Sequence, residues 1–419
     1  MADTMNESDA LDRYREHVRA WLEANLDRRP ADAAELPMMH EDAARLEGAR
    51  KLQRALFEGG FAGITWPTEY GGQGLSQEHQ EIFDQESRGF VLPQFGALYV
   101  TTYLVCGPAI VQFGTEAFKR EHVPAILRGD ELWCQFFSEP AAGSDLAGVQ
   151  TRAGRDGDAW VITGSKVWST MAAHAEYGMC LARTSWDAPK HQGLTWFAVR
   201  TDAPGLTMRP IRQLDGSAGF YEEFLDDVRV DDEARIGEVD DGWRVASAVL
   251  ANERAGGAIG EGGGAGNVRE RGADLVSTAR EAGRADDGAV RDLIARIRTE
   301  DWVNAQIRRR AADVADEHPL AGAYAKLSSG TLAPARAVAA MQIGRGAVVA
   351  WPREEGEHGE HSGVATRYLG SRAVSISAGS NEMQRNIISE RILGLPREPS
   401  FDRGKPFNQI LREAAQWQS

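Results

Sequence analysis

The stretch Cys134-Gln-Phe-Phe-Ser-Glu-Pro-Ala-Ala-Gly-Ser-Asp145 decides the fold, and Gly164-Ser-Lys-Val-Trp-Ser-Thr170 follows it about twenty residues later. The two segments combine hydroxyl groups, flat aromatic faces and a glycine that lets a ligand approach the backbone closely. These residues are Phe137, Ser138, Gly143, Ser144, Trp168, Ser169 and Thr170. The combination suits a planar ligand ring that forms hydrogen bonds. The alternative is an ordinary Gly-Ser turn beside a core tryptophan.

The residue pattern around these segments is typical of β-strands. Asp156-Gly157, followed by alternating apolar residues, is a strong hairpin signal. Short runs rich in β-branched or aromatic residues, bounded by Gly, Pro or Asp, predict further strands. They are Thr195–Arg200, Leu206–Ile211 and Glu222–Val230. We therefore expect a β domain over residues 131–240.

Helical periodicity flanks this region on both sides. Apolar residues recur at three- and four-residue spacing in Leu11–Leu26, and Ala43–Phe57, Gln77–Ser87 and Thr115–Leu127 are also predicted helices. The same spacing returns from Trp243 onward. The order predicts an α+β multi-domain fold: an N-terminal helical domain (1–130), the β domain, a C-terminal helical bundle (241–400) and a tail (401–419).

Composition narrows the class of protein. The 419 residues exceed what one hydrophobic core comfortably holds, and the net charge of −15 argues against nucleic acid as a partner. Three widely spaced cysteines without metal-ligand spacing fit a reducing compartment. The acidic N-terminus is unlike a signal or transit peptide, and no apolar run reaches membrane-spanning length. We expect a cytoplasmic protein that is not membrane-embedded.

The two segments resemble the acyl-CoA dehydrogenase family, whose signature reads like Ser-Glu-Pro-x-Ala-Gly-Ser-Asp and continues to Gly-x-Lys-x-Trp-x-Thr. Further segments that resemble the family's sequence occur along nearly the whole chain, at Trp66–Leu75, Phe224–Val230 and Ser377–Ile388. The resemblance implies an N-terminal helical domain, a middle β-barrel-like domain and a C-terminal four-helix bundle, assembled as a dimer or tetramer. It also implies FAD as cofactor and an acyl-CoA as substrate.

Carried over position by position, the resemblance assigns functional residues. Thr170 would form a hydrogen bond near flavin N5, and Ser144 lies where the family contacts the CoA portion. Ser144 and Arg254 are the expected substrate contacts, and no metal site is expected. The expected cofactor contacts are Gln135, Phe137, Ser138, Gly143, Ser144, Trp168, Ser169, Thr170, Ser380 and Glu382.

The implied reaction removes the α-proton of a thioester while hydride leaves the β-carbon for flavin N5, and a carboxylate in a dry pocket suits the base. Two family positions supply such a base. One is occupied here by Ala378, which cannot ionise; the other is Glu253, which precedes Arg254. The resemblance therefore points to Glu253. The alternative is an ordinary helix glutamate facing solvent.

Three further stretches depart from the family or invite other interpretations. The family's Arg-x-x-Phe-Gly segment, which holds the FAD pyrophosphate of a neighbouring subunit, is missing; 279–288 keeps only Arg280 and Arg284. Gly256–Gly266 does not fit a dinucleotide-binding loop and is read as space for a large acyl group or as a simple loop. His358 and His361 among glutamates are read as a solvated loop, not as metal ligands.

The leading hypothesis is FAD-dependent α,β-dehydrogenation of an acyl-CoA to the 2-enoyl-CoA, with electron-transfer flavoprotein as the acceptor implied by the family. One alternative is an acyl-CoA oxidase of the same fold. Another is a non-catalytic partner subunit of a hetero-oligomer, because the missing segment leaves the cofactor site incomplete. The acyl group itself is not encoded in any motif.

Overall fold

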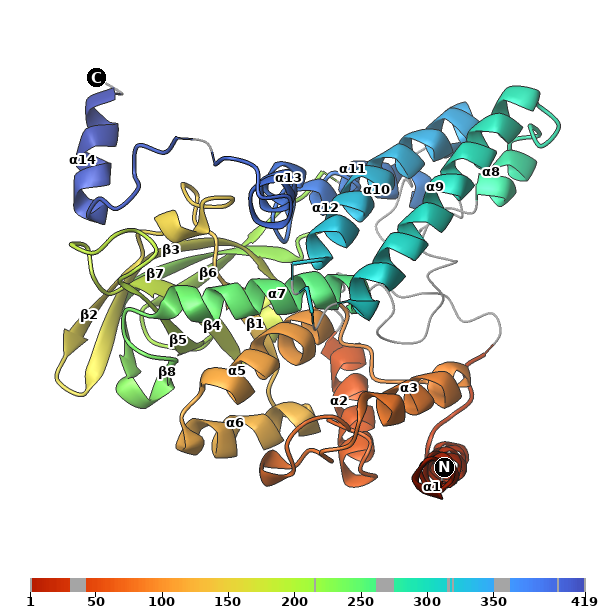
Figure 1. Cartoon of the computed structure of the whole chain (residues 1–419), viewed down its shortest axis with the longest axis horizontal. Helices are drawn as coiled ribbons and strands as arrows, with labels where there is room; N and C mark the ends of the chain where they lie inside the picture. The colour runs from red at the N-terminus through yellow and green to blue at the C-terminus, as the bar shows by residue number, and fades with distance from the viewer. Residues whose placement is uncertain are drawn as a thin grey trace. The chain divides into compact units, whose positions relative to one another are not determined.

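The computed structural model describes residues 2–30, 43–214, 216–260, 275–314, 317–318, 320–349, 362–397 and 399–417 (Figure 1). The chain divides into two compact units. Unit 1 comprises Met1–Arg212, Ala218–Asn252 and Ser400–Ser419; unit 2 comprises Gln213–Ser217 and Glu253–Pro399. Helices precede and follow one sheet along the chain, so the expected α+β class is confirmed. None of the helices in the described ranges is long and apolar enough to cross a membrane.

The N-terminal part of unit 1 is helical, as the periodicity predicts. The side chains of Val18 and Leu22 on the first helix are fully buried and pack with Phe61 and Phe83. Thr115 caps the sixth helix by accepting a hydrogen bond from the backbone amide of Phe118. The elements are α1 (Ala2–Asn25), α2 (Ala43–Glu58), α3 (Gln77–Glu86), α4 (Ala97–Tyr99), a π-helix (Val100–Cys106), α5 (Gly107–Phe113) and α6 (Glu116–Arg128).

The described part of unit 1 holds one sheet of eight strands. Its order is β6-β7-β3-β2-β4-β5-β8, with β1 paired to β4 in parallel. The predicted hairpin at Asp156-Gly157 joins β2 to β3, and the three predicted strands are β5, β6 and β7. The bounds are β1 (Trp133–Phe136), β2 (Arg152–Asp156), β3 (Ala159–Thr170), β4 (Tyr177–Arg183), β5 (Leu194–Arg200), β6 (Leu206–Ile211), β7 (Phe220–Asp231) and β8 (Arg235–Ile236).

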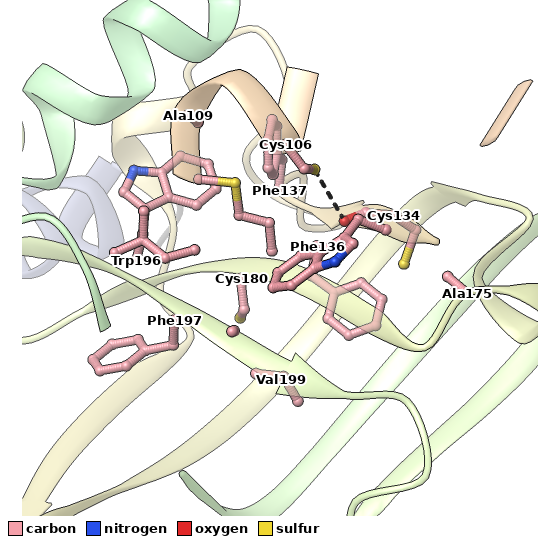
Figure 2. Close-up of a cluster of buried hydrophobic side chains, with 14 of the residues drawn as sticks. Cys106, Ala109, Cys134, Phe136, Phe137, Ala175, Cys180, Trp196, Phe197 and Val199 are labelled. Carbon is pink, nitrogen blue, oxygen red and sulfur yellow. Dashed lines mark hydrogen bonds between the residues drawn. The ribbon is translucent and has the colours of Figure 1, made fainter. Parts of the chain in front are cut away.

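Strand β1, which carries part of the quoted stretch, lies in the interior. Figure 2 shows Cys134, Phe136 and Phe137 among buried side chains of neighbouring strands and of the helix that bears Cys106. The thiol of Cys106 donates a weak hydrogen bond to the carbonyl oxygen of Cys134 at 3.6 Å (Figure 2). Thr102 accepts a hydrogen bond from the amide of Trp133 at 2.8 Å. The π-helix therefore fixes β1 from one side.

The C-terminal tail returns to the β-sheet of unit 1. Its helix α14 (Phe407–Trp417) contacts the loop that joins β4 to β5. The amide of Phe407 donates a hydrogen bond to the carbonyl oxygen of Ala188, in that loop, at 2.9 Å. The fully buried guanidinium of Arg183 lies 3.7 Å from the centroid of the Phe407 ring. Burial lowers the pKa of Arg183 to about 10. The guanidinium donates to the carbonyl oxygens of Ala147, Val149, Lys190 and Gln192.

Unit 2 is helical in its described residues. Small residues on α10 allow the segment 373–384 to lie close, where Ser375 and Asn381 both donate to the carbonyl oxygen of Gly330. Ser380 caps α13 by accepting from the amide of Met383. Helix α7 (Gly242–Gly260) begins in unit 1 and ends in unit 2. The others are α8 (Leu275–Glu281), α9 (Gly288–Asp313), α10 (Gly322–Gly344), α11 (Ser362–Gly370), α12 (Ala373–Ile376), α13 (Asn381–Ile387) and a π-helix (Ile388–Ile392).

The tail contact predicts a measurable stability difference. Phe407→Ala removes a buried ring, the nearer of the two aromatic rings beside the Arg183 guanidinium, so we expect a loss of about 3 kcal/mol in the unfolding free energy of unit 1. Gln409→Ala changes an exposed position on the same helix and should stay within about 0.5 kcal/mol of the parent. Thermal unfolding of both variants checks this. Equal midpoints would show that the tail does not stabilise the sheet.

Candidate functional site

A β-bulge in β3 places Trp168 at the protein surface. The pairing of β3 with β7 shifts register between Val167 and Ser169, and Trp168 adopts a φ of 69°, in the left-handed region that bulky residues seldom occupy. Its side chain is 58% exposed, whereas the next residue on the strand, Ser169, is buried. The bulge thus directs a large flat indole outward at the end of the strand.

Hydrogen bonds join the two quoted segments into one surface. The amide of Val167 donates to the carbonyl oxygen of Ser138 at 2.9 Å. Lys166 donates from Nζ to the carbonyl oxygen of Phe137 at 3.0 Å and to Oε1 of Glu139 at 2.8 Å. The end of β3 and the segment after β1 therefore lie side by side, as a shared ligand surface requires.

The Lys166–Glu139 ion pair is buried. The Lys166 side chain is fully buried and that of Glu139 is 8% exposed, so neither charge is screened by solvent. Glu139 also accepts from the backbone amides of Gln150 and Thr151, at 2.7 and 2.9 Å. Burial by itself raises the pKa of Glu139, but the ammonium of Lys166 and these hydrogen bonds outweigh it, so the pKa lies below its usual value. Glu139 is an ionised anchor for the loop that carries Gly143 and Ser144.

Two expected cofactor contacts turn their side chains inward. The Phe137 ring packs edge-to-face against Trp196 at 4.5 Å between centroids, inside the core. The Ser169 hydroxyl, also buried, donates to Oε2 of Glu223 at 2.8 Å. Any contribution of these two residues to a surface site comes from their backbone. Thr170 and Ser138 are half-buried, which leaves part of each open to a ligand.

The Gln135 side chain offers a donor without a partner. Its amide Nε2 is buried and has no hydrogen-bond acceptor within the described part of the chain. An unsatisfied buried donor is costly, and a bound polar group or an ordered water relieves that cost.

The loop from Glu139 to Asp145 exposes its tip. Gly143 and Ser144 are exposed, and no atom of the described residues outside its chain neighbours lies within 4 Å of a Cβ placed on Gly143. The amides and carbonyls of Glu139 and Ala142 pair with each other at 3.0 Å, which closes the base of the loop. Asp145, next to Ser144, pairs with Lys190, which also pairs with Asp402 of the tail.

The remaining expected site residues belong to unit 2. Glu253 lies on α7 and is half-buried. Ser380 is the cap of α13, and Glu382 is exposed with an ion pair to Arg385 at 3.3 Å. The side chain of Arg254, most of Gly256–Gly266 beyond the end of α7, and both His358 and His361 lie outside the described residues.

Arg284, which remains where the family's pyrophosphate-binding segment is missing, has partners within unit 2. Its guanidinium donates to the carbonyl oxygens of Gln342 and Ile343 and to Asp287 at 2.8 Å. This arginine links α10 to the start of α9 and is occupied by protein groups.

Sequence reasoning missed Glu223. The inward positions of β7 alternate as Tyr221, Glu223 and Leu225, so a fully buried carboxyl faces the interior. Burial raises the pKa of Glu223 to about 8, against the opposing effects of the Ser169 hydrogen bond and the charge of Lys166. The signal was present in the sequence: a charged residue interrupts the apolar face of a predicted strand.

Comparison with known proteins assigns the family. Three models of one family match in chain order: "Acyl-CoA dehydrogenase, N-terminal domain" at residues 8–130, the middle domain at 134–228 and the C-terminal domain at 240–393. The acyl-CoA dehydrogenase IpdE1 of Mycobacterium tuberculosis is 37% identical over 393 residues, covering 93% of this chain and 98% of that protein. The chain belongs to the acyl-CoA dehydrogenase family. It is therefore an oxidoreductase, as the sequence resemblance predicted.

Other acyl-CoA dehydrogenases extend the comparison. The (2S)-methylsuccinyl-CoA dehydrogenase of Cereibacter sphaeroides is 30% identical, covering 92% of this chain and 71% of that protein. The solved structure of the Tcur3481–Tcur3483 steroid ACAD has a TM-score of 0.70 at 27% identity, covering 93% of this chain and 98% of that chain. The ChsE4–ChsE5 complex of Mycobacterium tuberculosis has a TM-score of 0.67 at 25% identity, covering 93% and 98%.

Acyl-CoA dehydrogenases generally bind FAD, and the surface of unit 1 fits a flat, polar ring. Trp168 presents an open aromatic face where the strand ends, and Gln135 supplies an unpartnered donor on the adjacent segment. Thr170 adds a half-buried hydroxyl on the same strand end. An exposed aromatic face with a hydroxyl group two residues further along the strand suits an aromatic heterocycle.

Loss of the buried ion pair should cost more unfolding free energy than loss of an exposed one. Lys166→Met leaves the Glu139 carboxylate buried and unpaired, so we expect a loss of about 3–5 kcal/mol in unfolding free energy at neutral pH. Part of this loss should be regained as the pH falls, because protonation removes the unpaired charge. Lys119→Met, which breaks a pair with the exposed Glu116, should cost at most about 1 kcal/mol. Equal losses in urea unfolding would contradict the role given to Lys166.

Proposed function

We propose that this chain catalyses the FAD-dependent α,β-dehydrogenation of an acyl-CoA to the 2-enoyl-CoA, with Glu253 as the base. The observation that carries the proposal is the joined surface of unit 1, where the segments at Gln135–Ser144 and Trp168–Thr170 are held together by Lys166 and by the Val167–Ser138 hydrogen bond. FAD, when bound there, supplies the acceptor for the hydride that leaves the β-carbon.

The residues of this surface have separate tasks in the proposal. Trp168 offers its indole as a flat support for the ring, and Thr170 donates its hydroxyl to a ring nitrogen. Gln135 donates its free amide hydrogen to a ring acceptor. Ser144 and Gly143, at the exposed loop tip, bind the CoA portion of the substrate through hydroxyl and backbone groups. Ser380, Glu382 and Arg254 remain proposed contacts from unit 2.

Glu253 is proposed to remove the α-proton. Its carboxylate is half-buried on α7, and a carboxylate held in place beside its substrate can accept a proton from carbon. The other family position for this base is Ala378, whose methyl group carries no proton acceptor. Ala378 has a φ of 53° and precedes Gly379 at 85°, so the turn that carries this position is present without the acid.

The base assignment predicts a loss and a rescue. Glu253→Gln should bind flavin but slow its bleaching by a productive acyl-CoA by roughly 10²–10⁴-fold, the usual contribution of a general base. Placing a carboxylate at the second family position, Ala378→Glu, in the Glu253→Gln background should restore part of the rate. Stopped-flow absorbance of the flavin measures both. Bleaching of Glu253→Gln at the parent rate would rule out Glu253 as the base.

The proposed substrate is a CoA ester with a bulky, ring-bearing acyl group, and the proposed assembly is a complex with a related subunit. Both rest on likeness to the steroid ACAD Tcur3481–Tcur3483 and to the ChsE4–ChsE5 complex, each of which is named for two chains. Electron-transfer flavoprotein is the proposed acceptor, and the cytoplasm the proposed location.

A second candidate function is that of a non-catalytic partner subunit. It is favoured by Arg284, which binds protein carbonyls and Asp287 and is therefore not available to a diphosphate of a neighbouring subunit.

Purification of the chain by itself separates the two candidates. If the chain is an enzyme by itself, it should retain flavin after purification. Steroid-side-chain CoA esters should then bleach the bound flavin faster than straight-chain, branched or aromatic CoA esters. Protein that stays colourless with added FAD, and gains flavin only with a related subunit, would favour the second candidate. Visible absorbance before and after addition of each CoA ester gives the answer.

A further inference from the structure

We propose that Glu223 is a positioning residue for the flavin-facing strand end: through Ser169, its buried side chain sets how β3 presents Trp168 and Thr170. The consequence for flavin rests on the function proposed above. The effect on Trp168 is a property of unit 1 and does not require flavin.

The link is short and direct. Ser169 lies between Trp168 and Thr170, and its hydroxyl donates to Oε2 of Glu223 at 2.8 Å. The register shift between Val167 and Ser169 turns the Ser169 side chain inward while Trp168 is exposed. A bulge holds an extra residue without ladder partners, so a side-chain hydrogen bond on the adjacent residue helps to keep it in place. Glu223 is thus the interior anchor of the bulge.

The anchor is only half satisfied. Glu223 is fully buried, and its second oxygen, Oε1, has no hydrogen-bond partner among the described residues. A buried carboxyl in this state is protonated at neutral pH, because ionisation would place a charge in the core with one hydrogen bond. Ionisation at higher pH therefore changes the charge directly behind the bulge.

The groups around Glu223 are few and identifiable. Lys166 is its cross-strand neighbour on β3, and the positive charge of Lys166 lowers the pKa of Glu223. Lys166 is already bound to Glu139 and to the carbonyl oxygen of Phe137, so it does not neutralise a second carboxylate fully. Among the described residues, the titratable groups that interact with Glu223 are Lys166 on β3, Cys134 on β1, Cys180 on β4 and, on its own strand, Glu222.

The thiols of Cys134 and Cys180 do not compete for this role. Burial raises the pKa of Cys134 well above its usual value and that of Cys180 to about 12, so both stay neutral where Glu223 titrates. The pKa of the Glu139 carboxyl lies below its usual value, so this group stays ionised over the same range. Near pH 8 the charge that changes behind the bulge is that of Glu223.

The test follows Trp168 itself by fluorine NMR of the full chain labelled with 5-fluorotryptophan. The chain has eleven tryptophans, and the Trp168 resonance is identified by its loss in Trp168→Phe. We expect this resonance to shift with a midpoint near pH 8 in the parent protein. Glu223→Gln, which keeps an acceptor for Ser169 but cannot ionise, should abolish the shift.

Two further variants keep the result interpretable. Ser169→Ala cuts the link and should remove most of the shift while Glu223 remains. Glu222→Gln changes the same charge at the neighbouring position of β7 and should keep the shift, with its midpoint moved to lower pH because one negative charge is gone. A parent resonance that does not move between pH 6 and pH 10, on the order of two units either side of the expected value, overturns the proposal. So does a shift that survives in Glu223→Gln.

Flavin-loaded protein supplies a second readout. Ionisation behind the ring adds negative charge and should lower the flavin midpoint potential more steeply above pH 8 in the parent than in Glu223→Gln. Parallel curves for the two proteins would remove the flavin part of the inference. A chain that binds no flavin at all would contradict the proposed function, while the NMR titration would still decide the role of Glu223.

Discussion

The buried ion pair between Lys166 and Glu139 is the constraint on which the candidate site depends. A full charge inside a protein must be paired and hydrogen-bonded, and here each partner meets that demand with groups from a different segment. Lys166 donates a hydrogen bond to the carbonyl oxygen of Phe137, and Glu139 accepts hydrogen bonds from the backbone amides of Gln150 and Thr151. Separation of the segments would expose two charges to an apolar core, so the pair fixes them as one surface.

Two local irregularities convert this fixed framework into a binding face. The bulge in β3 turns Trp168 outward, and the buried Glu223 holds the next residue from behind. The end of β3 thus has the exposed indole of Trp168 on its outer side and the titratable carboxyl of Glu223 on its inner side. Gly164 belongs to this framework too, since a Cβ there would lie 2.4 Å from the hydroxyl oxygen of Thr151 and force β3 away from the anchored loop. These features suit a rigid support for a flat ligand.

The sequence predicted the arrangement of elements better than the direction of side chains. Alternation and turn residues located the hairpin at Asp156-Gly157 and the strands β5, β6 and β7, because period-two patterning reports burial directly. The inward direction of Ser169 could not be predicted, since a bulge shifts the alternation by one residue without a reliable sequence signal. Phe137 follows the last residue of β1, where strand alternation no longer decides which way a side chain points. The contact of α14 with the sheet could not be predicted from the sequence either. It depends on long-range contacts of Arg183 that no local pattern encodes. The roles of Glu253, Ser380 and Glu382 stay predictions from family resemblance.

A flavin ring is proposed to lie against Trp168, on the surface that Lys166 and Glu139 hold together. The most direct measurement is the fluorescence of flavin bound to the parent chain and to Trp168→Phe, with Trp302→Phe as a control at a tryptophan that is 66% exposed in unit 2. Contact with an indole quenches flavin emission, so we expect weak emission in the parent and in the control, and a clear gain in Trp168→Phe. Equal emission from all three proteins, with flavin bound in each, would contradict this placement of the ring.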